Sequence, residues 1–223
     1  MLNQRHGVAV SGKTVLKLMR QEHLACQVRR KKYRSYRGEV GKIAANILQR
    51  QFHAEAPNQK WVTDVTEFKI AGKRQYLSPI IDLFNGEVVS YTLKDSPALP
   101  LIREMLDQAL ATLPEGVKPL IHSDQGWQYQ HISYRKTLES HGLTQSMSRK
   151  ANCLDNAMAE NFFGHFKEEF LRRKHFTNIQ QFKTELDKYM AWYNQERIQI
   201  KLKGLSPVEY RTQSLATVNP TPF

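Results

Sequence analysis

Cysteine and long apolar runs are both scarce in this sequence of 223 residues. Its two cysteines, Cys26 and Cys153, lie far apart and form no CxxC pair, which excludes a disulfide framework and fits a reducing compartment. No apolar run reaches about 18 residues, and Met1–Arg20 lacks the apolar stretch and small residues of a secretory signal. We therefore expect a cytoplasmic protein and no membrane partner.

Acidic residues are scarce in the first quarter of the chain. Residues 1–60 contain 13 Lys and Arg but 3 Asp and Glu, whereas residues 61–223 contain 20 and 18, so most of the net charge of +12 belongs to an N-terminal arm. Its densest part interleaves two tyrosines with the cations Arg29, Arg30, Lys31, Lys32, Arg34 and Arg37. This composition suits a polyanion and predicts nucleic acid as the partner. A solvated tail or a membrane-surface segment is the alternative, although no apolar face adjoins the cations.

Outside this arm the composition is that of a folded protein. Hydrophobic residues make up 40% of the chain and aromatic residues 10%, and the length suffices for one large domain, so disorder throughout is excluded. Apolar spacing predicts a helix over residues 11–28, capped by Ser11 or Thr14, which is either half of a helix-turn-helix or a piece that docks on a partner. A basic linker follows, with a short helix around residues 43–52.

From Trp61 onward, strand and helix patterns follow one another. Runs of β-branched and aromatic residues predict three antiparallel strands, with Asn85-Gly86 as a hairpin turn. These strands cover residues 61–68, 76–84 and 87–93, and two more cover 119–123 and 143–148. Helices are predicted over 99–113, 132–141, 156–173 and 179–197, with a last turn or two after Ser206-Pro207. This order predicts an α/β fold in which helices flank a five-stranded mixed sheet, preceded by a basic, partly helical N-terminal arm.

Three acidic residues occur where a carboxylate needs a partner. Asp64 lies in the middle of the first predicted strand, among apolar and β-branched residues, where a bare carboxylate is costly unless it is paired or bound to a metal. Asp124 follows the fourth strand and precedes Gly126, which allows a sharp turn, and ligands collect at such strand ends. Glu160 lies early in the helix that follows the fifth strand. Three acids thus come from separate elements.

The helix that contains Glu160 also has an apolar stripe. Phe162, Phe166 and Phe170 recur every four residues and define its buried side. Lys167 follows Glu160 by seven residues, about 700° of rotation, which places the acid and the base on one face beside the stripe. The carboxylate could hold a cation there while the ammonium meets a phosphate. A surface helix with ordinary salt bridges is the alternative.

Three convergent carboxylates suit hard divalent cations. Mg²⁺ or Mn²⁺ prefers oxygen ligands and leaves coordination positions open for water or phosphate oxygens. Two such ions can activate an attacking hydroxyl and stabilise the leaving 3′ oxygen of a phosphodiester. The acids therefore predict nuclease or transesterase chemistry, and the basic arm makes nucleic acid the natural substrate.

Three segments carry a resemblance to a known family. They are WVTDVTEF, HSDQGWQY and SMSRKANCLDNAMAENFFGHFKEEF, with 35 residues between Asp124 and Glu160. These segments resemble the DDE catalytic core of retroviral integrases and, more closely, the transposases encoded by the second reading frame of many bacterial insertion sequences. The resemblance extends from about Tyr33 to Tyr210 and implies the ribonuclease H-like fold. We accordingly divide the chain into an arm with a partial helix-turn-helix and linker (1–56), a catalytic core with C-terminal helices (57–215) and a tail (216–223).

The resemblance implies a role for each matching residue. Asp64 takes the place of the acid that bridges both metals, and Asp124 and Glu160 take the places of the acids that hold one metal each. Lys167 matches the basic residue that lies against the DNA end. Further DNA contacts are expected at Gln125, Gln128, Tyr129, Arg149 and Lys150, besides the cations of the arm.

Some positions depart from the family pattern or leave two readings open. Relatives generally extend farther upstream, with a complete helix-turn-helix and, in a frameshifted fusion, a first-frame DNA-binding domain. Ala151 stands where many relatives have glycine. Asp155 and Asn156 either cap the following helix or contact substrate, and His122 and His165 are packing or phosphate-contact residues rather than zinc ligands.

The implied function is that of a DDE-type DNA transposase, which cuts donor DNA at the 3′ ends of an insertion element and joins them to target DNA with two Mg²⁺ or Mn²⁺ ions. Its expected partners are element-end and target DNA, further copies of the chain, and the first-reading-frame protein or a frameshift fusion, in a bacterial cytoplasm at the nucleoid. Two alternatives stay open: a truncated DNA-binding regulator of transposition, and a nuclease of the same fold.

Overall fold

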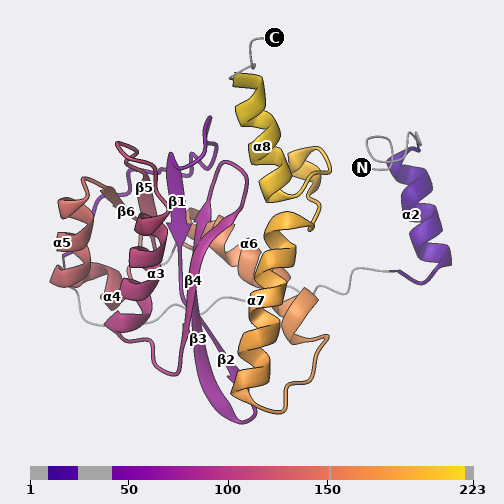
Figure 1. The fold of residues 1–223 in the computed structure, drawn as a ribbon, viewed down its shortest axis with the longest axis horizontal. Coiled ribbons are helices and arrows are strands. Elements are labelled where there is room, and N and C mark those ends of the chain that lie inside the picture. The colour runs from indigo at the N-terminus through magenta and orange to yellow at the C-terminus, as the bar shows by residue number, and fades with distance from the viewer. Residues whose placement is uncertain (1–9, 25–41, 151, 219–223) are drawn as a thin grey trace.

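A mixed β-sheet lies at the centre of the molecule, with helices on both faces (Figure 1). The computed structural model describes residues 10–24, 42–150 and 152–218, so the predicted cation cluster at residues 29–37 and Ala151 lie outside the described residues. The strands are β1 (Lys60–Thr63), β2 (Thr66–Ile70), β3 (Lys73–Asp82), β4 (Val88–Lys94), β5 (Leu120–Ser123) and β6 (Thr144–Met147). They lie in the order β4-β3-β1-β5-β6, with β2 beside β3 in line with β1. β5 is parallel to β1 and β6, whereas β3 is antiparallel to its neighbours.

The helices divide between the two faces of the sheet. One face is covered by α3 (Leu99–Ala111), α4 (Trp127–Gln130) and α5 (Ile132–Ser140). The other is covered by α6 (Ala157–His165), the π-helix η2 (Phe166–Leu171) and α7 (Ile179–Gln195) (Figure 1). The remaining elements are α2 (Gly12–Gln21), α8 (Pro207–Val218) and the 3₁₀ turns η1 (Cys153–Asn156) and η3 (Ile200–Leu202). The predicted α/β fold with a mixed sheet between helices is confirmed.

Each face of the sheet has its own apolar core, because side chains alternate along a strand. Trp61 and Ile80 point towards α3, α4 and α5, whereas Val62 and Ile81 point towards α6, η2 and α7. All four side chains are at most 3% exposed. The sheet therefore holds β1, the strand that leads to Asp64, rigidly between two packed layers.

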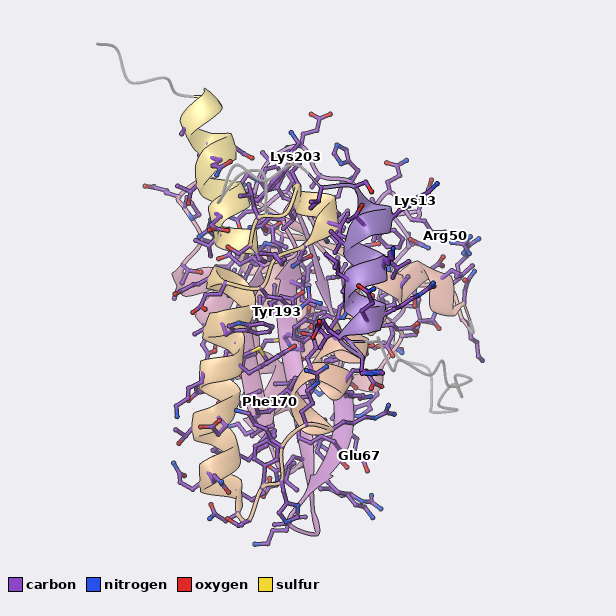
Figure 2. All side chains as sticks on the ribbon, turned by 90° about the vertical axis from the view of Figure 1, so that its right-hand side faces the viewer. Lys13, Arg50, Glu67, Phe170, Tyr193 and Lys203 are labelled. Carbon is purple, nitrogen blue, oxygen red and sulfur yellow. The ribbon has the colours of Figure 1, made fainter. Side chains whose placement is uncertain are left out.

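The predicted phenylalanine stripe forms the contact between the α6–η2 helix and α7. Phe162 meets Tyr193 edge-on at 5.2 Å between ring centroids, and Phe170 lies 5.0 Å from Tyr189. Figure 2 shows Phe170 and Tyr193 along the side of α7 that faces the sheet. Because aromatic rings bury large apolar areas, this contact fixes α6 and η2 against α7.

The first predicted strand is split, so the sheet has six strands where five were predicted. The register does not change, because Thr63 lies opposite Ile80 and Thr66 opposite Leu77. The ladder is interrupted opposite Pro79, which has no N–H to donate. Asp64 therefore lies directly after β1 and not in the middle of a strand, which corrects the prediction.

Several predicted boundaries also differ from the structure. The predicted helix at residues 43–52 is wrong: this stretch contains only turns and extended chain, although Leu48 and Ala54 are buried in the core. The short helix α4 was not predicted, and α8 is longer than the expected turn or two. The divisions at residues 56 and 215 stay predictions.

The helix α2 begins where the sequence predicts, because Ser11 Oγ accepts the N–H of Thr14 at 3.1 Å. It ends at Gln21, earlier than predicted, and none of its residues is buried. Leu16, Leu18 and Met19 are exposed. Among the described helices, α2 included, none is long and apolar enough to cross a membrane.

Candidate active site

Asp64 and Asp124 lie at matching positions on two adjacent parallel strands. β1 and β5 pair with Val62 opposite His122, and each aspartate follows two residues later. The carboxyl ends of parallel strands meet at one edge of a sheet, where ligands bind in open α/β folds. The two carboxylates are therefore brought together by the sheet register itself.

A backbone N–H holds each of the two carboxylates. Asp64 Oδ1 accepts the N–H of Val65 at 2.7 Å, and Asp124 Oδ1 accepts the N–H of Gly126 at 2.8 Å. A Cβ atom at position 126 would lie 2.9 Å from Asp124 Oδ1 and 2.6 Å from Gln128 Nε2. A side chain at position 126 would therefore displace Asp124 or Gln128.

The site destabilises negative charge. Burial raises the pKa of Asp64 well above its ordinary value, and the carboxylates of Asp124 and Glu160 raise it further. Burial also raises the pKa of Asp124, against the opposing effect of the Gly126 N–H. Burial raises the pKa of Glu160 as well. Without a cation, these acids therefore bind protons more readily than isolated carboxyl groups.

Tyr129 forms the floor beneath the two aspartates. Its side chain is 0% exposed, its hydroxyl lies 3.4 Å from Thr63 Oγ1, and its ring meets Tyr134 edge-on at 5.5 Å. Burial raises the pKa of Tyr129 well above its ordinary value, and Asp64 and Asp124 raise it further. The predicted DNA contact by Tyr129 is corrected accordingly: the ring packs in the core and supports the site from below.

Glu160 and Lys167 reach the same site from the α6–η2 helix. Both act electrostatically on Asp64: the carboxylate of Glu160 raises the pKa of Asp64, whereas the ammonium of Lys167 lowers it. Lys167 is exposed, and its helical turn is a π-turn in which the N–H of Arg172 donates to the carbonyl of Lys167 at 3.0 Å. The shared face predicted for the acid and the base agrees with their common effect on Asp64.

The acids do not form a closed metal cage. Among the described residues, no three His, Cys, Asp or Glu side chains are arranged so that they could hold a metal ion as they stand. The donor set nevertheless fits a hard divalent cation, because Asp64, Asp124 and Glu160 supply carboxylate oxygens, and burial, which raises the pKa of each, makes a neutralising cation favourable. Open sites of this kind leave room for substrate oxygens.

The other predicted DNA contacts differ in how far they are exposed. Gln125 donates through Nε2 to the carbonyl of Ser148 at 3.0 Å and is partly buried, whereas Gln128 is only 8% exposed, packed against Gly126. Lys150 is exposed. Gln125 and Gln128 thus shape the loop after Asp124, and Lys150 faces solvent.

Asp155 is the residue whose importance the sequence did not indicate. It is 0% exposed, and its carboxylate accepts hydrogen bonds from Asn46, Arg50 and Arg149. Asn156 stands at the N-cap position of α6 without a side-chain capping bond, and the carboxylate of Asp155 binds side chains of other segments instead. The one feature of the sequence that could have indicated this role is that Asp155 follows the basic pair Arg149-Lys150 in the segment before Glu160.

Both singled-out histidines make local contacts, as predicted. His122 is buried on β5 with Nδ1 at 2.8 Å from Ser146 Oγ, and burial lowers the pKa of His122 to about 4. His165 Nδ1 lies 3.4 Å from Glu169 Oε1. Glu169 also accepts two hydrogen bonds from Arg197 of the segment after α7, at 2.6 and 2.8 Å.

Comparison with known proteins decides the family. The integrase core domain family matches residues 54–153 and again residues 160–215. The transposase InsK of insertion element IS150 from Escherichia coli is 51% identical over 210 residues, which cover 94% of this chain and 74% of InsK. This chain belongs to the insertion-sequence transposases with an integrase core. A transposase-like protein from Haemophilus influenzae is 52% identical over 95% of this transposase and 97% of its own length. The transposase InsF of IS3 from Escherichia coli is 31% identical over 212 residues.

Solved structures place the fold of the transposase among retroviral integrase cores. The catalytic core domain of HTLV-2 integrase in complex with magnesium, in a trimeric form, matches with a TM-score of 0.57 and 21% identity over 70% of this chain and 98% of that one. The catalytic core of BIV integrase matches with a TM-score of 0.55 and 15% identity over 72% and 98%. The predicted ribonuclease H-like fold is confirmed.

Proposed function

We propose that this DNA transposase cuts at the 3′ ends of its insertion element and joins them to target DNA, with Asp64, Asp124 and Glu160 as the catalytic acids. The observation that carries this proposal is the pair of aspartates at matching ends of adjacent parallel strands, with Glu160 acting on the same site from α6. Acids gathered in a partly buried site repel one another unless a cation lies among them. A site that destabilises its own negative charge is therefore suited to cation-dependent chemistry.

Mg²⁺ or Mn²⁺ is the cation that these residues would hold. Asp64 would bridge two ions, and Asp124 and Glu160 would each hold one. Bound there, the ions would supply a polarised phosphodiester and an activated hydroxyl. The magnesium complex of the HTLV-2 integrase core supports this choice of ion by analogy of fold.

The remaining residues bind and position the DNA. Lys167 is exposed beside Asp64 and would meet a phosphate of the DNA end. The exposed Lys150 and the cations of the N-terminal arm would bind the backbone, releasing its condensed counterions. The Gly126 N–H keeps Asp124 Oδ1 oriented while the substrate enters.

The joining reaction also needs further protein chains. Two element ends must be brought together, so we expect a homo-multimer. The first-reading-frame protein, free or fused to this chain, would supply recognition of the terminal repeats, since none of the residues of the described helix α2 is buried. The trimeric and dimeric forms described for the HTLV-2 integrase core support assembly by analogy of fold.

Incubation of the purified chain with Mn²⁺ and labelled duplexes bearing the ends of its element tests this proposal. We expect cut and joined products from the wild-type chain and a loss of at least about a hundredfold in Asp64→Asn, Asp124→Asn and Glu160→Gln. Glu104→Gln, which removes one carboxylate of an exposed ion pair with Lys94, is the matched control and should leave the products unchanged. Hydrolysis without joining would indicate a nuclease instead, and DNA binding without any cleavage would indicate a regulator.

A further inference from the structure

The segment Asn46–Arg50 is fastened to the strand that carries Asp124. Two consecutive backbone N–H groups of the segment donate to Ser146 Oγ on β6 at 2.9 and 3.0 Å. Both lone pairs of this oxygen are then occupied, so its O–H donates to Nδ1 of His122, 2.8 Å away. His122 lies on β5, two residues before Asp124. A continuous chain of hydrogen bonds therefore joins the segment to that strand end.

The same segment is also fastened to the loop that leads to Glu160. Asp155, five residues before Glu160, accepts hydrogen bonds from Asn46 Nδ2 at 3.0 Å and from Arg50 Nε at 2.7 Å. Arg149 adds its backbone N–H at 3.0 Å and two guanidinium N–H groups at 2.9 and 3.0 Å. The hydrogen bonds from Arg149 hold the pKa of Asp155 well below its usual range. A carboxylate that is 0% exposed is stable as an anion only while these donors surround it.

The backbone of the segment is strained where it meets Asp155. Gln49 and Arg50 have φ values of 46° and 64°, a left-handed conformation that residues with a side chain rarely adopt. The N–H of Gln49 donates to Asn46 Oδ1 at 2.9 Å, which closes the turn. Such strain persists only where the surroundings enforce it, and it gathers at functional sites. Here the strained backbone directs the side chain of Arg50 towards the buried carboxylate of Asp155. Figure 2 shows Arg50 on the opposite side of the molecule from α7.

We propose that Asp155 is a positioning residue: together with the segment Asn46–Arg50 it holds the loop before Glu160 in a fixed place relative to the strand end that carries Asp124. This assignment rests on the proposed catalytic roles of those two acids. Aromatic packing holds α6 against α7, and Ala159 near its N-terminal end is buried in the same core. The chain enters α6 through η1 and the loop that contains Asp155. The buried carboxylate therefore fixes the loop that leads into α6 to the segment Asn46–Arg50.

Hydrogen exchange and steady-state kinetics on the full chain test the assignment. In Asp155→Asn we expect amide exchange to accelerate together in residues 42–50 and 149–160, because one carboxylate fastens both. We expect kcat for joining to fall by about ten- to a hundredfold with KM for DNA nearly unchanged, because a displaced acid impairs reaction more than binding. Arg50→Gln removes one of the two contacts that the segment makes with Asp155, while Asn46 and Arg149 still bind the carboxylate, so it should give a milder form of both effects and remain folded.

Asp107→Asn, which removes the carboxylate of an exposed pair with Arg103 on α3, is the control and should change neither readout. Asp155→Asn combined with Arg50→Gln should lose less than the product of the single effects. Raised KM with unchanged kcat would overturn the assignment and make Arg50 and Arg149 DNA-binding residues instead. Accelerated exchange confined to one of the two segments would overturn it as well. A wild-type chain that neither cuts nor joins DNA would refute the proposed function, and the exchange data would still decide whether Asp155 couples the segments.

Discussion

The environment of Asp64 affects its ionisation in two opposite ways. Its strand end places it in a partly buried position close to Asp124, where burial and a like charge both raise its pKa. Only one hydrogen bond within the site, from the N–H of Val65, favours the ionised form of Asp64. A residue held in this way contributes reactivity towards a cation and weakens the fold that holds it.

Asp64→Asn should therefore stabilise the protein in the absence of metal. The amide oxygen can keep the N–H of Val65, while the repulsion with Asp124 disappears, so we expect Tm in EDTA at pH 7 to rise by a few degrees, corresponding to about 1 kcal/mol. Addition of Mg²⁺ should raise Tm of the wild type and not of the variant, because a ligand stabilises only the state that binds it. Differential scanning calorimetry measures both effects. A variant less stable than the wild type in EDTA would show that Asp64 is no source of repulsion.

Gly126→Ala should impair the site through Asp124. The added methyl group would lie 2.9 Å from Asp124 Oδ1 and 2.6 Å from Gln128 Nε2, so both side chains must move. We expect joining activity to fall by about tenfold or more and stability by about 1–3 kcal/mol, measured by product formation and urea unfolding. Gly164→Ala is the matched control: nothing lies within 4 Å of its Cβ, and an alanine inside α6 should be neutral or slightly stabilising. Equal losses in the two variants would contradict the argument.

Elements that the sequence predicts well are those whose pattern is local. The phenylalanines at every fourth position of α6 and η2, and the strands around Asn85-Gly86, needed only their own neighbours to be recognised. The split between β1 and β2 lies opposite Pro79, which belongs to β3, so the sequence of the split strand itself does not indicate it. The π-turn at Lys167 could not be predicted either, because residues four apart share a face in both an α-turn and a π-turn. Local periodicity identifies an element without determining its interruptions.

Glu169 should give the π-helix a stability that depends on pH. Burial alone would raise the pKa of Glu169, but hydrogen bonds from Arg197 and His165 lower it to about 2. Because the folded value lies below the ordinary one, the unfolded chain binds the proton more tightly. The stabilisation is therefore complete above about pH 4.5 and is lost as the pH falls towards 2.

Glu169→Gln should cost about 2 kcal/mol at neutral pH, because Arg197 loses its charged partner in a partly buried site. The difference from the wild type should shrink between pH 4.5 and 2, which urea unfolding at a series of pH values measures. Glu185→Gln is the control, since the pairs of Glu185 with Lys174 and Lys188 lie on the surface and should contribute less, with a larger response to salt. A pH-independent difference for Glu169→Gln would contradict the lowered pKa.

At the scale of the whole molecule, the site could be predicted where single residues stood out and could not where distant segments meet. Asp64 broke the pattern of its strand, Asp124 followed a strand end, and Glu160 shared a helix face with Lys167; the sheet then brought Asp64 and Asp124 to one edge. Asp155 looked like part of a helix start, because its partner Asn46 lies 109 residues away in the sequence. The ion pairs of Asp155 with Arg50 and Arg149 have no signature in the local sequence, because the two arginines resemble DNA-binding arginines.

The uneven charge of the chain predicts how its DNA affinity responds to salt. The core from residue 61 onward is nearly neutral, with 20 basic and 18 acidic residues, so its electrostatic attraction for DNA should be small beside that of the arm. Replacement of the arm cations Arg29, Arg30, Lys31, Lys32, Arg34 and Arg37 by serine should therefore weaken DNA binding and reduce the slope of log K against log [salt] by up to about 5. Fluorescence anisotropy with a labelled duplex at several salt concentrations measures this slope.

The same six-residue variant separates binding by the arm from chemistry in the core. Its Tm and its Mg²⁺-dependent rise in Tm should equal those of the wild type, because Asp64, Asp124 and the packed layers around them are untouched. As the control, replacement of six exposed cations of the core, namely Lys69, Lys73, Lys118, Lys136, Arg173 and Lys183, by serine removes the same charge and should change the salt slope less. Equal slopes for the two variants would mean that DNA responds to the net charge of the chain and not to its concentration in the arm.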